Sequence, residues 1–299
     1  MPDTPRPALD LRPLSKSTWR QRGPTARAIR TFGLQEQALE RLSGGQGICW
    51  TDGRFVLKPV GYAPEHRWVC QVYAEWRAHD EVRVVEPVEP HSADEPGGWS
   101  VDGWAAHVFL AGRETELPRE VARVKEASDA FHHHIRDLPR PEFIDLRNDP
   151  WAFGDRLAWE NGPADGDVET LDLIGRLRSH LAPVGSPSQL IHGDILPNVL
   201  LADGRPPAVI DWPPYYRPVE MANAIAVTDA VTFRSAPLSL LSLLDEWAAG
   251  ADWYQVLARA LLYRLGPTGI FAVRNRLMGS LVTHVRLVRP VADAVLSRL

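Results

Sequence analysis

Apolar and polar positions alternate differently in the two parts of this chain. In residues 42–60, short apolar runs are separated by a Gly-rich turn and by the pair Asp52-Gly53, which is typical of a β-hairpin. Residues 65–79 carry apolar side chains at helical spacing, and two more strand-like runs complete the pattern. We therefore expect a small antiparallel sheet with one helix in residues 40–112.

After residue 112 the pattern is mainly helical. Amphipathic segments predict helices in 118–135, 149–160 and 168–181, and helical spacing resumes beyond Met221. Breaks at glycine or Gly-Pro are expected near residue 250 and in 266–269.

The order of these elements predicts an α+β protein with two lobes. Residues 1–39 form an N-terminal extension, with a helix from about Pro24 to Leu42. Residues 40–112 form the N-lobe, a small antiparallel sheet with one main helix. Residues 113–299 form a larger, mostly α-helical C-lobe.

The composition narrows the partners that we expect. The chain has 44% hydrophobic residues and a net charge of -5, without a basic run, so no nucleic-acid partner is expected. No apolar run is long enough for a membrane span or a signal peptide, and Cys49 and Cys70 form no disulfide framework. A cytoplasmic location and no membrane partner are the expectations, and the oligomeric state stays open.

Lys58 stands out because only three of the 33 basic residues are lysines. It ends the strand-like run "RFVLKPV", where it could contact a phosphate while a carboxylate holds it. Glu75, on the following helix, is the candidate partner. The alternative is a strand-end lysine that reaches into solvent.

Three glycines precede that strand, in "LSGGQGICW". Glycine lets backbone N–H groups approach phosphate oxygens, but a plain hairpin turn would have the same composition. The segment is not a Walker motif, because no Gly-Lys-Ser/Thr follows. The residues concerned are Gly44, Gly45 and Gly47.

The most specific segment is "LIHGDILPNVLLADGRPPAVIDW", residues 190–212. It places His192, Asp194, Asn198 and Asp211 between apolar runs. One His with one Asp is a poor transition-metal set, whereas Asn and Asp oxygens suit Mg²⁺. Asp194 would then accept a proton from an attacking hydroxyl.

The motifs "IHGDILPN" and "VIDW" resemble the catalytic segment of the aminoglycoside phosphotransferase and choline kinase-like family, small-molecule relatives of protein kinases. The resemblance covers about Leu42 to Ala230, because the weaker upstream signals follow in the family's order. It implies a protein-kinase-like fold, ATP or GTP as the nucleotide, and Mg²⁺.

The resemblance also implies a role for each motif residue. The nucleotide would be held by the glycine turn, by Lys58 paired with Glu75, and by a hinge at 109–112 that binds the base through its backbone. At the reaction centre we expect a base, two Mg²⁺ ligands and a histidine that braces the loop. These residues are Gly44, Gly45, Gly47, Lys58, Glu75, Phe109 and Leu110 for the nucleotide, Asp194 as the base, Asn198 and Asp211 for Mg²⁺, and His192 as the brace.

The chain departs from the family pattern in two places. Asn198 follows Asp194 by four positions instead of five, and Pro-Pro-Tyr-Tyr follows Trp212 where the family has an acidic residue and later Asp-Leu-Ala. An inactive nucleotide-binding pseudokinase with a regulatory role is therefore the alternative to an active enzyme. A protein kinase fits less well, because neither Asp-Phe-Gly nor Ala-Pro-Glu occurs.

Charge in the last third favours a particular kind of acceptor. From Trp212 onward there are nine arginines, six acidic residues and no lysine, which suits a neutral or anionic hydroxyl compound better than a polycationic aminoglycoside. Tyr215, Tyr216 and Arg217 are candidates for contacting it, although they could also be aromatics packed on a surface loop. The run of histidines at 132–134 is not expected to bind one metal, since consecutive helical residues point in different directions.

Overall fold

The computed structural model describes residues 23–42, 47–94, 97–243, 252–274 and 279–299. Its internal contacts divide the chain into two units. Among the described residues, the sheet unit contains those from Gly23 to Arg113 together with Leu200–Asp211, and the helical unit contains those of Glu114–Val199 and Trp212–Leu299.

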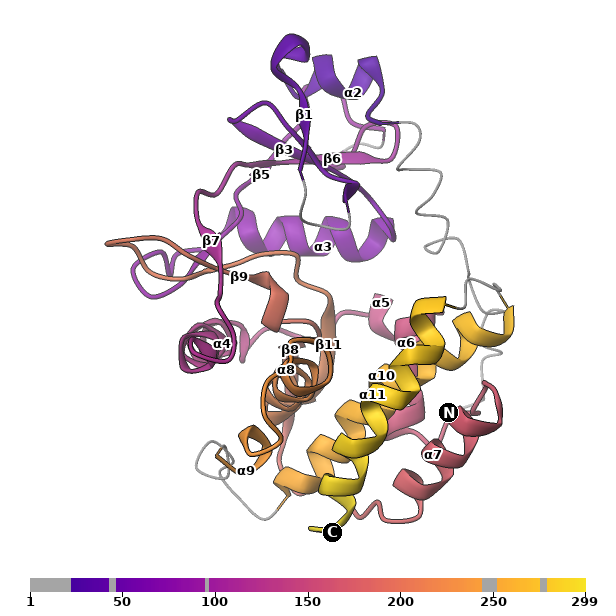
Figure 1. Ribbon diagram of the computed structural model, residues 1–299. Helices are drawn as coiled ribbons and strands as arrows, with labels where there is room; N and C mark the ends of the chain where they lie inside the picture. The colour runs from indigo at the N-terminus through magenta and orange to yellow at the C-terminus, as the bar shows by residue number, and fades with distance from the viewer. Residues whose placement is uncertain (1–22, 43–46, 95–96, 244–251, 275–278) are drawn as a thin grey trace. The chain divides into compact units, whose positions relative to one another are not determined.

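The sheet unit is built on a five-stranded antiparallel sheet with the order β1-β2-β3-β6-β5. The predicted hairpin at Asp52-Gly53 is present, because β2 and β3 pair on either side of it. The helix α3 (Ala63–Ala74) runs alongside this sheet (Figure 1). The strands are β1 (Glu40–Arg41), β2 (Trp50–Thr51), β3 (Phe55–Pro59), β5 (Pro87–Val88) and β6 (Trp104–Val108).

One helix of the sheet unit is shorter than predicted. Instead of a helix from Pro24 to Leu42, the structure has α2 (Ala26–Thr31) and a single 3₁₀ turn, η2 (Glu36–Ala38). Gly33, with a φ of 71°, lies just beyond α2 in the left-handed region, which continues no α-helix. The buried face of α2 joins Leu57 and Trp104 in the apolar core of this unit.

A second sheet has the order β4-β10-β9-β7. Its strands β4 and β10 are parallel, with Arg83 opposite Ala208. This pairing corrects our division of the chain, since it groups residues 200–211 with the sheet unit although we had placed them in the C-lobe. The strands are β4 (Arg83–Val84), β7 (Arg113–Glu114), β9 (Val199–Leu201) and β10 (Ala208–Val209).

In the helical unit, α10 packs against α6, α7, α8 and α11. Figure 1 shows α10 and α11 side by side. The two strands β8 (Ser188–His192) and β11 (Pro214–Pro218) pair antiparallel, and β8 contacts α4 and α8. The helices are α4 (Val121–Ile135), α5 (Phe143–Leu146), α6 (Pro150–Trp159), α7 (Val168–Arg178), α8 (Glu220–Phe233), α9 (Leu240–Leu243), α10 (Trp253–Arg274) and α11 (Gly279–Leu296).

The helix α10 runs through the break that we predicted at 266–269. A Cβ on Gly266 would lie 2.6 Å from the Cα of Gly154, and a Cβ on Gly154 would lie 2.3 Å from the carbonyl oxygen of Tyr263. These glycines therefore serve a close crossing of α6 and α10 and do not end a helix. The other predicted break, near residue 250, lies outside the described residues.

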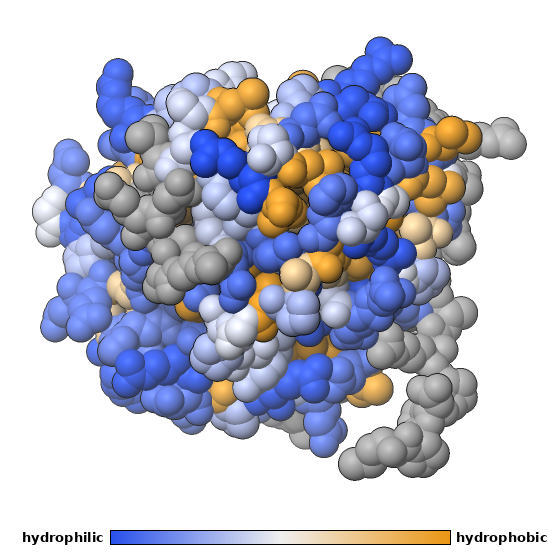
Figure 2. All heavy atoms as spheres, turned by 90° about the horizontal axis from the view of Figure 1, so that it is seen from below, coloured by the Kyte–Doolittle hydropathy of each residue, from blue (hydrophilic) through white to orange (hydrophobic). Residues whose placement is uncertain are grey.

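Within the described part of the chain, no helix combines the length and the apolar character that a membrane span needs. On the face drawn in Figure 2, apolar residues are interspersed among hydrophilic ones.

Candidate active site

Asp194 lies in a tight turn directly after β8. The backbone N–H of Gly193 donates to the carbonyl of Pro213, next to the paired strands β8 and β11. The ring of Tyr215 fills the space beside Gly193, because a Cβ there would lie 2.4 Å from two ring carbons. The strand pair thus fixes the backbone that carries the carboxylate, which itself is 39% exposed.

Two buried histidines hold this turn through backbone hydrogen bonds. His192 Nδ1 accepts from the N–H of Asp194 at 3.1 Å, and His132 Nε2 accepts from the N–H of His192 at 3.0 Å. His132 therefore carries its proton on Nδ1, 2.6 Å from the carbonyl oxygen of Ser128. Burial, followed by the nearby His192, lowers the pKa of His132 to about 3, so the ring is neutral at physiological pH.

Asn198 lies close to Asp194 in spite of the short loop. A 3₁₀ turn, η4 (Leu196–Asn198), returns the chain, and the side-chain Nδ2 of Asn198 donates to the carbonyl of Asp194 at 2.7 Å. This bond uses the amide nitrogen, and the amide oxygen is the atom of the group that can bind a cation.

A buried arginine from α10 contacts the Asp194 carboxylate. Arg264 Nη2 lies 2.6 Å from Asp194 Oδ1, and Arg264 Nε lies 2.9 Å from Asp229 Oδ1. Burial lowers the pKa of Arg264, but the two carboxylates outweigh this effect and hold it well above the usual value. The guanidinium is therefore a permanent cation beside the predicted base.

In the sheet unit, Lys58 pairs with Asp211. Its Nζ lies 2.6 Å from Asp211 Oδ1, and the two side chains are 27% and 65% exposed. Burial lowers the pKa of Lys58, but the carboxylate of Asp211 more than compensates, and the net shift is upward. Asp211 has a φ of 49°, which is uncommon for a residue other than glycine.

The prediction that Lys58 pairs with Glu75 is wrong: both residues are described, and the carboxylate that pairs with Lys58 is that of Asp211. Glu75 is one residue beyond the end of α3 and is exposed, and its backbone N–H donates to Val72. The α3 residues that interact electrostatically with Lys58 are instead Cys70, which raises the pKa of Lys58, and His66, whose own pKa Lys58 lowers. Our helical pattern extended to residue 79, whereas the helix ends at Ala74, so Glu75 cannot project from its face.

Neutral groups surround the Lys58 ammonium. Burial, and then the charge of Lys58, lowers the pKa of His66 to about 4, and burial raises the pKa of the Cys70 thiol to about 12. His107, on β6, is buried, and its ring nitrogens have no hydrogen-bond partner within the described residues. Asp211 is therefore the negative charge that compensates Lys58 here.

The remaining nucleotide predictions are tested only in part by the structure. Gly44 and Gly45 lie outside the described residues, and Gly47 has a φ of 65°. In the predicted hinge, the backbone N–H of Phe109 donates to the carbonyl of Arg54 at 2.8 Å, so this donor is already used. Leu110 is half-buried.

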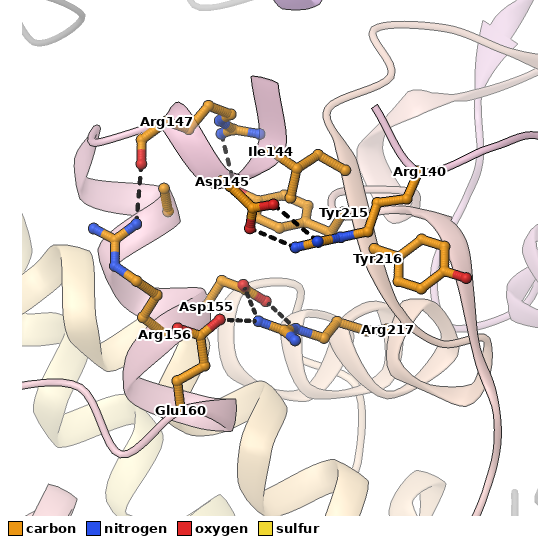
Figure 3. Close-up of a pocket in the computed structure, with 11 residues that line it drawn as sticks. Arg140, Ile144, Asp145, Arg147, Asp155, Arg156, Glu160, Tyr215, Tyr216 and Arg217 are labelled. Atoms are coloured by element: carbon orange, nitrogen blue, oxygen red, sulfur yellow. Dashed lines mark hydrogen bonds and ion pairs between the residues drawn. The ribbon is translucent and has the colours of Figure 1, made fainter. Parts of the chain in front are cut away.

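A pocket lined by charged and aromatic side chains lies in the helical unit (Figure 3). Two ion pairs line it, Arg140 with Asp145 and Arg217 with Asp155, each with two hydrogen bonds. The other lining residues are Ile144, Arg147, Ala152, Arg156, Glu160, Tyr215 and Tyr216.

Tyr215 connects this pocket to the turn before Asp194. Its hydroxyl accepts from Arg147 Nη2 at 3.0 Å, and its ring packs on Gly193. The predicted substrate candidates Tyr215, Tyr216 and Arg217 therefore lie together on β11 and line the pocket.

The structure brings the predicted residues together in two groups that belong to different units. His192, Asp194 and Asn198 lie in the helical unit, and Lys58 and Asp211 lie in the sheet unit. Sequence reasoning missed Arg264, Asp229 and His132. Only His132 carried a signal, as part of the run of histidines, and we had weighed it solely as a metal ligand.

Comparison with known proteins agrees with the motifs. Residues 50–215 match the model of the family described as "Phosphotransferase enzyme family". This range contains the hairpin, Lys58 and both catalytic-segment motifs. No curated protein matches the sequence at a significant level.

Three solved structures show the same fold. A microcompartment-associated aminopropanol kinase is 16% identical, with a TM-score of 0.62, and the match covers 91% of this chain and 96% of that one. The aminoglycoside phosphotransferase APH(4)-Ia is 17% identical, with a TM-score of 0.56 and coverages of 92% and 99%. A choline/ethanolamine kinase family protein from Mesorhizobium loti is 16% identical, with a TM-score of 0.57 and coverages of 95% and 98%. The predicted α+β fold class is confirmed.

Proposed function

Because the chain belongs to the phosphotransferase enzyme family, we propose that it transfers the γ-phosphoryl group of Mg²⁺-bound ATP to a hydroxyl group of a small molecule. The observation that carries this proposal is Asp194, a partly exposed carboxylate at a turn whose backbone is fixed on both sides. Such a group can receive the hydroxyl proton as the new bond to phosphorus forms.

Lys58, Asp211 and Asn198 are the proposed nucleotide and metal contacts. Mg²⁺ prefers carboxylate and amide oxygens, which Asp211 and Asn198 provide, and the Lys58 cation suits phosphate oxygens. When bound, ATP would supply the phosphoryl group and Mg²⁺ would offset its negative charge. GTP is the alternative nucleotide. The bond between Phe109 and Arg54 leaves the next residues of the hinge, Leu110 onward, to hold the base.

The Arg-rich pocket is the proposed acceptor site, and it supports a neutral or anionic acceptor. Its lining has four arginines and three carboxylates, and the half-buried Asp149 pairs with Arg147 at 2.9 Å. The carboxylates are thus compensated, so a polycation would meet guanidinium groups without an excess of negative charge. Tyr216, with Arg140 5.6 Å from its ring centre, adds an aromatic face.

A thermal-shift experiment tests the nucleotide part of the proposal. A ligand that binds only the folded state raises the apparent melting temperature, so Mg²⁺ with ATP should stabilise the parent but not Asp211→Ala. Equal stabilisation of both proteins would show that Asp211 does not bind the Mg²⁺–nucleotide complex. Repeating the series with GTP distinguishes the two nucleotides.

A charge-matched series of sugars tests the acceptor part. Glucose, glucuronate and glucosamine share the same sugar ring and differ in charge. We expect phosphorylation of glucose or glucuronate and none of glucosamine. Preferential phosphorylation of the cationic sugar would contradict the assignment of the pocket.

The alternative, an inactive nucleotide-binding regulator, has one observation in its favour. The carboxylate of Asp194 is bound by Arg264, and such an ion pair could hold it away from a substrate. Nucleotide-induced stabilisation without any Asp194-dependent turnover would favour the regulator.

A further inference from the structure

Arg264 lies between two carboxylates of very different exposure. Its Nη2 reaches Asp194, which is 39% exposed, while its Nε and Nη2 contact Asp229, whose side chain is 9% exposed. The guanidinium itself is 10% exposed. One cation thus joins a buried acid on α8 to the acid proposed as the base.

Aromatic rings limit the movement of this guanidinium. Its central carbon lies 5.1 Å from the ring centre of Tyr263 and 5.6 Å from that of Trp151, on α6. Ring contacts at these distances, together with two hydrogen bonds to Asp229, hold a guanidinium in one orientation. The direction of the bond to Asp194 is therefore set by α6, α8 and α10 together.

The contact with Asp194 uses one carboxylate oxygen. Arg264 binds Oδ1, and the backbone bonds of His192 and Asn198 are made to the N–H and C=O of Asp194 and not to its carboxylate. The charge of the cation is shared, because Asp229 makes the larger number of bonds to it. Arg264 can thus orient the carboxylate of Asp194 while Asp229 offsets much of the positive charge.

We propose that Arg264 is a positioning residue for the transfer step, which holds Oδ1 of Asp194 so that Oδ2 receives the acceptor's proton. This inference rests on the proposed function. In the step, the acceptor oxygen bonds to the γ-phosphorus, its proton passes to Oδ2, and the bond from phosphorus to the bridging oxygen of ADP breaks. Asp229 orients the guanidinium in turn.

The test compares Arg264→Gln with Arg259→Gln. Arg259 is a matched control because it is also buried on α10, but it binds Gln255 and the carbonyl of Ala182 and does not contact Asp194. With Mg²⁺-bound ATP and water as the acceptor, we expect kcat of Arg264→Gln to fall about 100-fold, the loss typical of a misplaced catalytic group, with KM for ATP unchanged. Arg259→Gln should keep the parental kcat per folded molecule.

Rescue distinguishes positioning from a merely structural role. In Arg264→Ala, millimolar guanidinium can enter the space between the two rings and restore part of kcat, whereas Arg259→Ala should not respond. If Arg264→Gln keeps the parental kcat per folded molecule while Asp194→Asn loses it, the inference is overturned and the proposed function stands. If Asp194→Asn also keeps it, the proposed function fails.

A measurement without turnover completes the test. Urea midpoints of Arg264→Gln, Asp194→Asn and the double variant form a cycle, and the double variant should lose less than the sum of the single losses. Additive losses would overturn the inference whether or not an acceptor is found.

Discussion

Gly193 leaves room for the ring of Tyr215 beside the turn that carries Asp194. We expect Gly193→Ala to destabilise the protein by about 1–3 kcal/mol, the usual cost of overpacking, because the added carbon would lie 2.4 Å from the ring. Urea unfolding measures the change. Gly175→Ala is the control, since a Cβ there meets open space inside α7 and should stabilise the helix by about 0.5–1 kcal/mol. Equal effects of the two variants would refute this account of the turn.

The buried His132 makes the stability of the helical unit depend on pH. Its pKa is lowered from 6.5 to about 3, so the unfolded chain takes up the proton first as the pH falls. Stability from this group is complete above pH 6.5 and is lost as the pH falls toward 3. His132→Gln should therefore lose less stability over this range than the parent, as measured by urea midpoints.

Two other histidines, His66 and His284, have pKa values of about 4 and should leave part of the acid loss in place. The exposed His133→Gln is the control and should follow the parent. Parallel curves for His132→Gln and the parent would show that His132 contributes nothing to the acid loss.

At this scale, the sequence predicts motif residues better than their neighbours. Asp194 and Asp211 could be singled out because a charge that borders an apolar strand needs a reason. Arg264 could not, since one arginine in "LLYRLG" resembles any solvated helix position until the folded chain places it beside residues 35 and 70 positions away.

At the scale of the elements, the ion pair of Lys58 with Asp211 joins strand β3 to the segment before Trp212. Both side chains are partly exposed, and such pairs contribute only about 0–1 kcal/mol to stability. Lys58→Met should therefore change the free energy of unfolding by less than about 1 kcal/mol but abolish stabilisation by Mg²⁺ with ATP. Urea unfolding measures the change in free energy, and thermal shift with and without Mg²⁺-bound ATP measures the nucleotide response.

Lys125→Met is the control for that variant. Lys125 also pairs with a carboxylate, Asp129 on α4, and its replacement should leave the nucleotide response intact. If Mg²⁺-bound ATP stabilises Lys58→Met as much as it stabilises the parent, Lys58 does not contact the nucleotide.

The elements themselves were predictable where the pattern is local. The hairpin and the helices α4, α6 and α7 follow from turn residues and helical spacing. The strand β11 was not predicted, because its pairing with β8 joins residues that "PPYYRP" alone does not connect. The continuity of α10 was missed for a similar reason, since its glycines serve the contact with α6.

For the whole molecule, the order of motifs was informative, since the family match of residues 50–215 spans Lys58, the segment from His192 to Asn198, and Asp211. The assignment of residues 200–211 to the sheet unit was not predictable, since it depends on the pairing of β10 with the distant β4.

The central claim is that this chain transfers a phosphoryl group with Asp194 as the base. The direct measurement is the rate of acceptor-dependent ADP release from Mg²⁺-bound ATP, across a panel of hydroxyl compounds, for the parent and Asp194→Asn. We predict turnover by the parent and a loss of about 100-fold or more in the variant, the usual contribution of a general base, with unchanged nucleotide-induced stabilisation. Equal rates in the two proteins would contradict the claim.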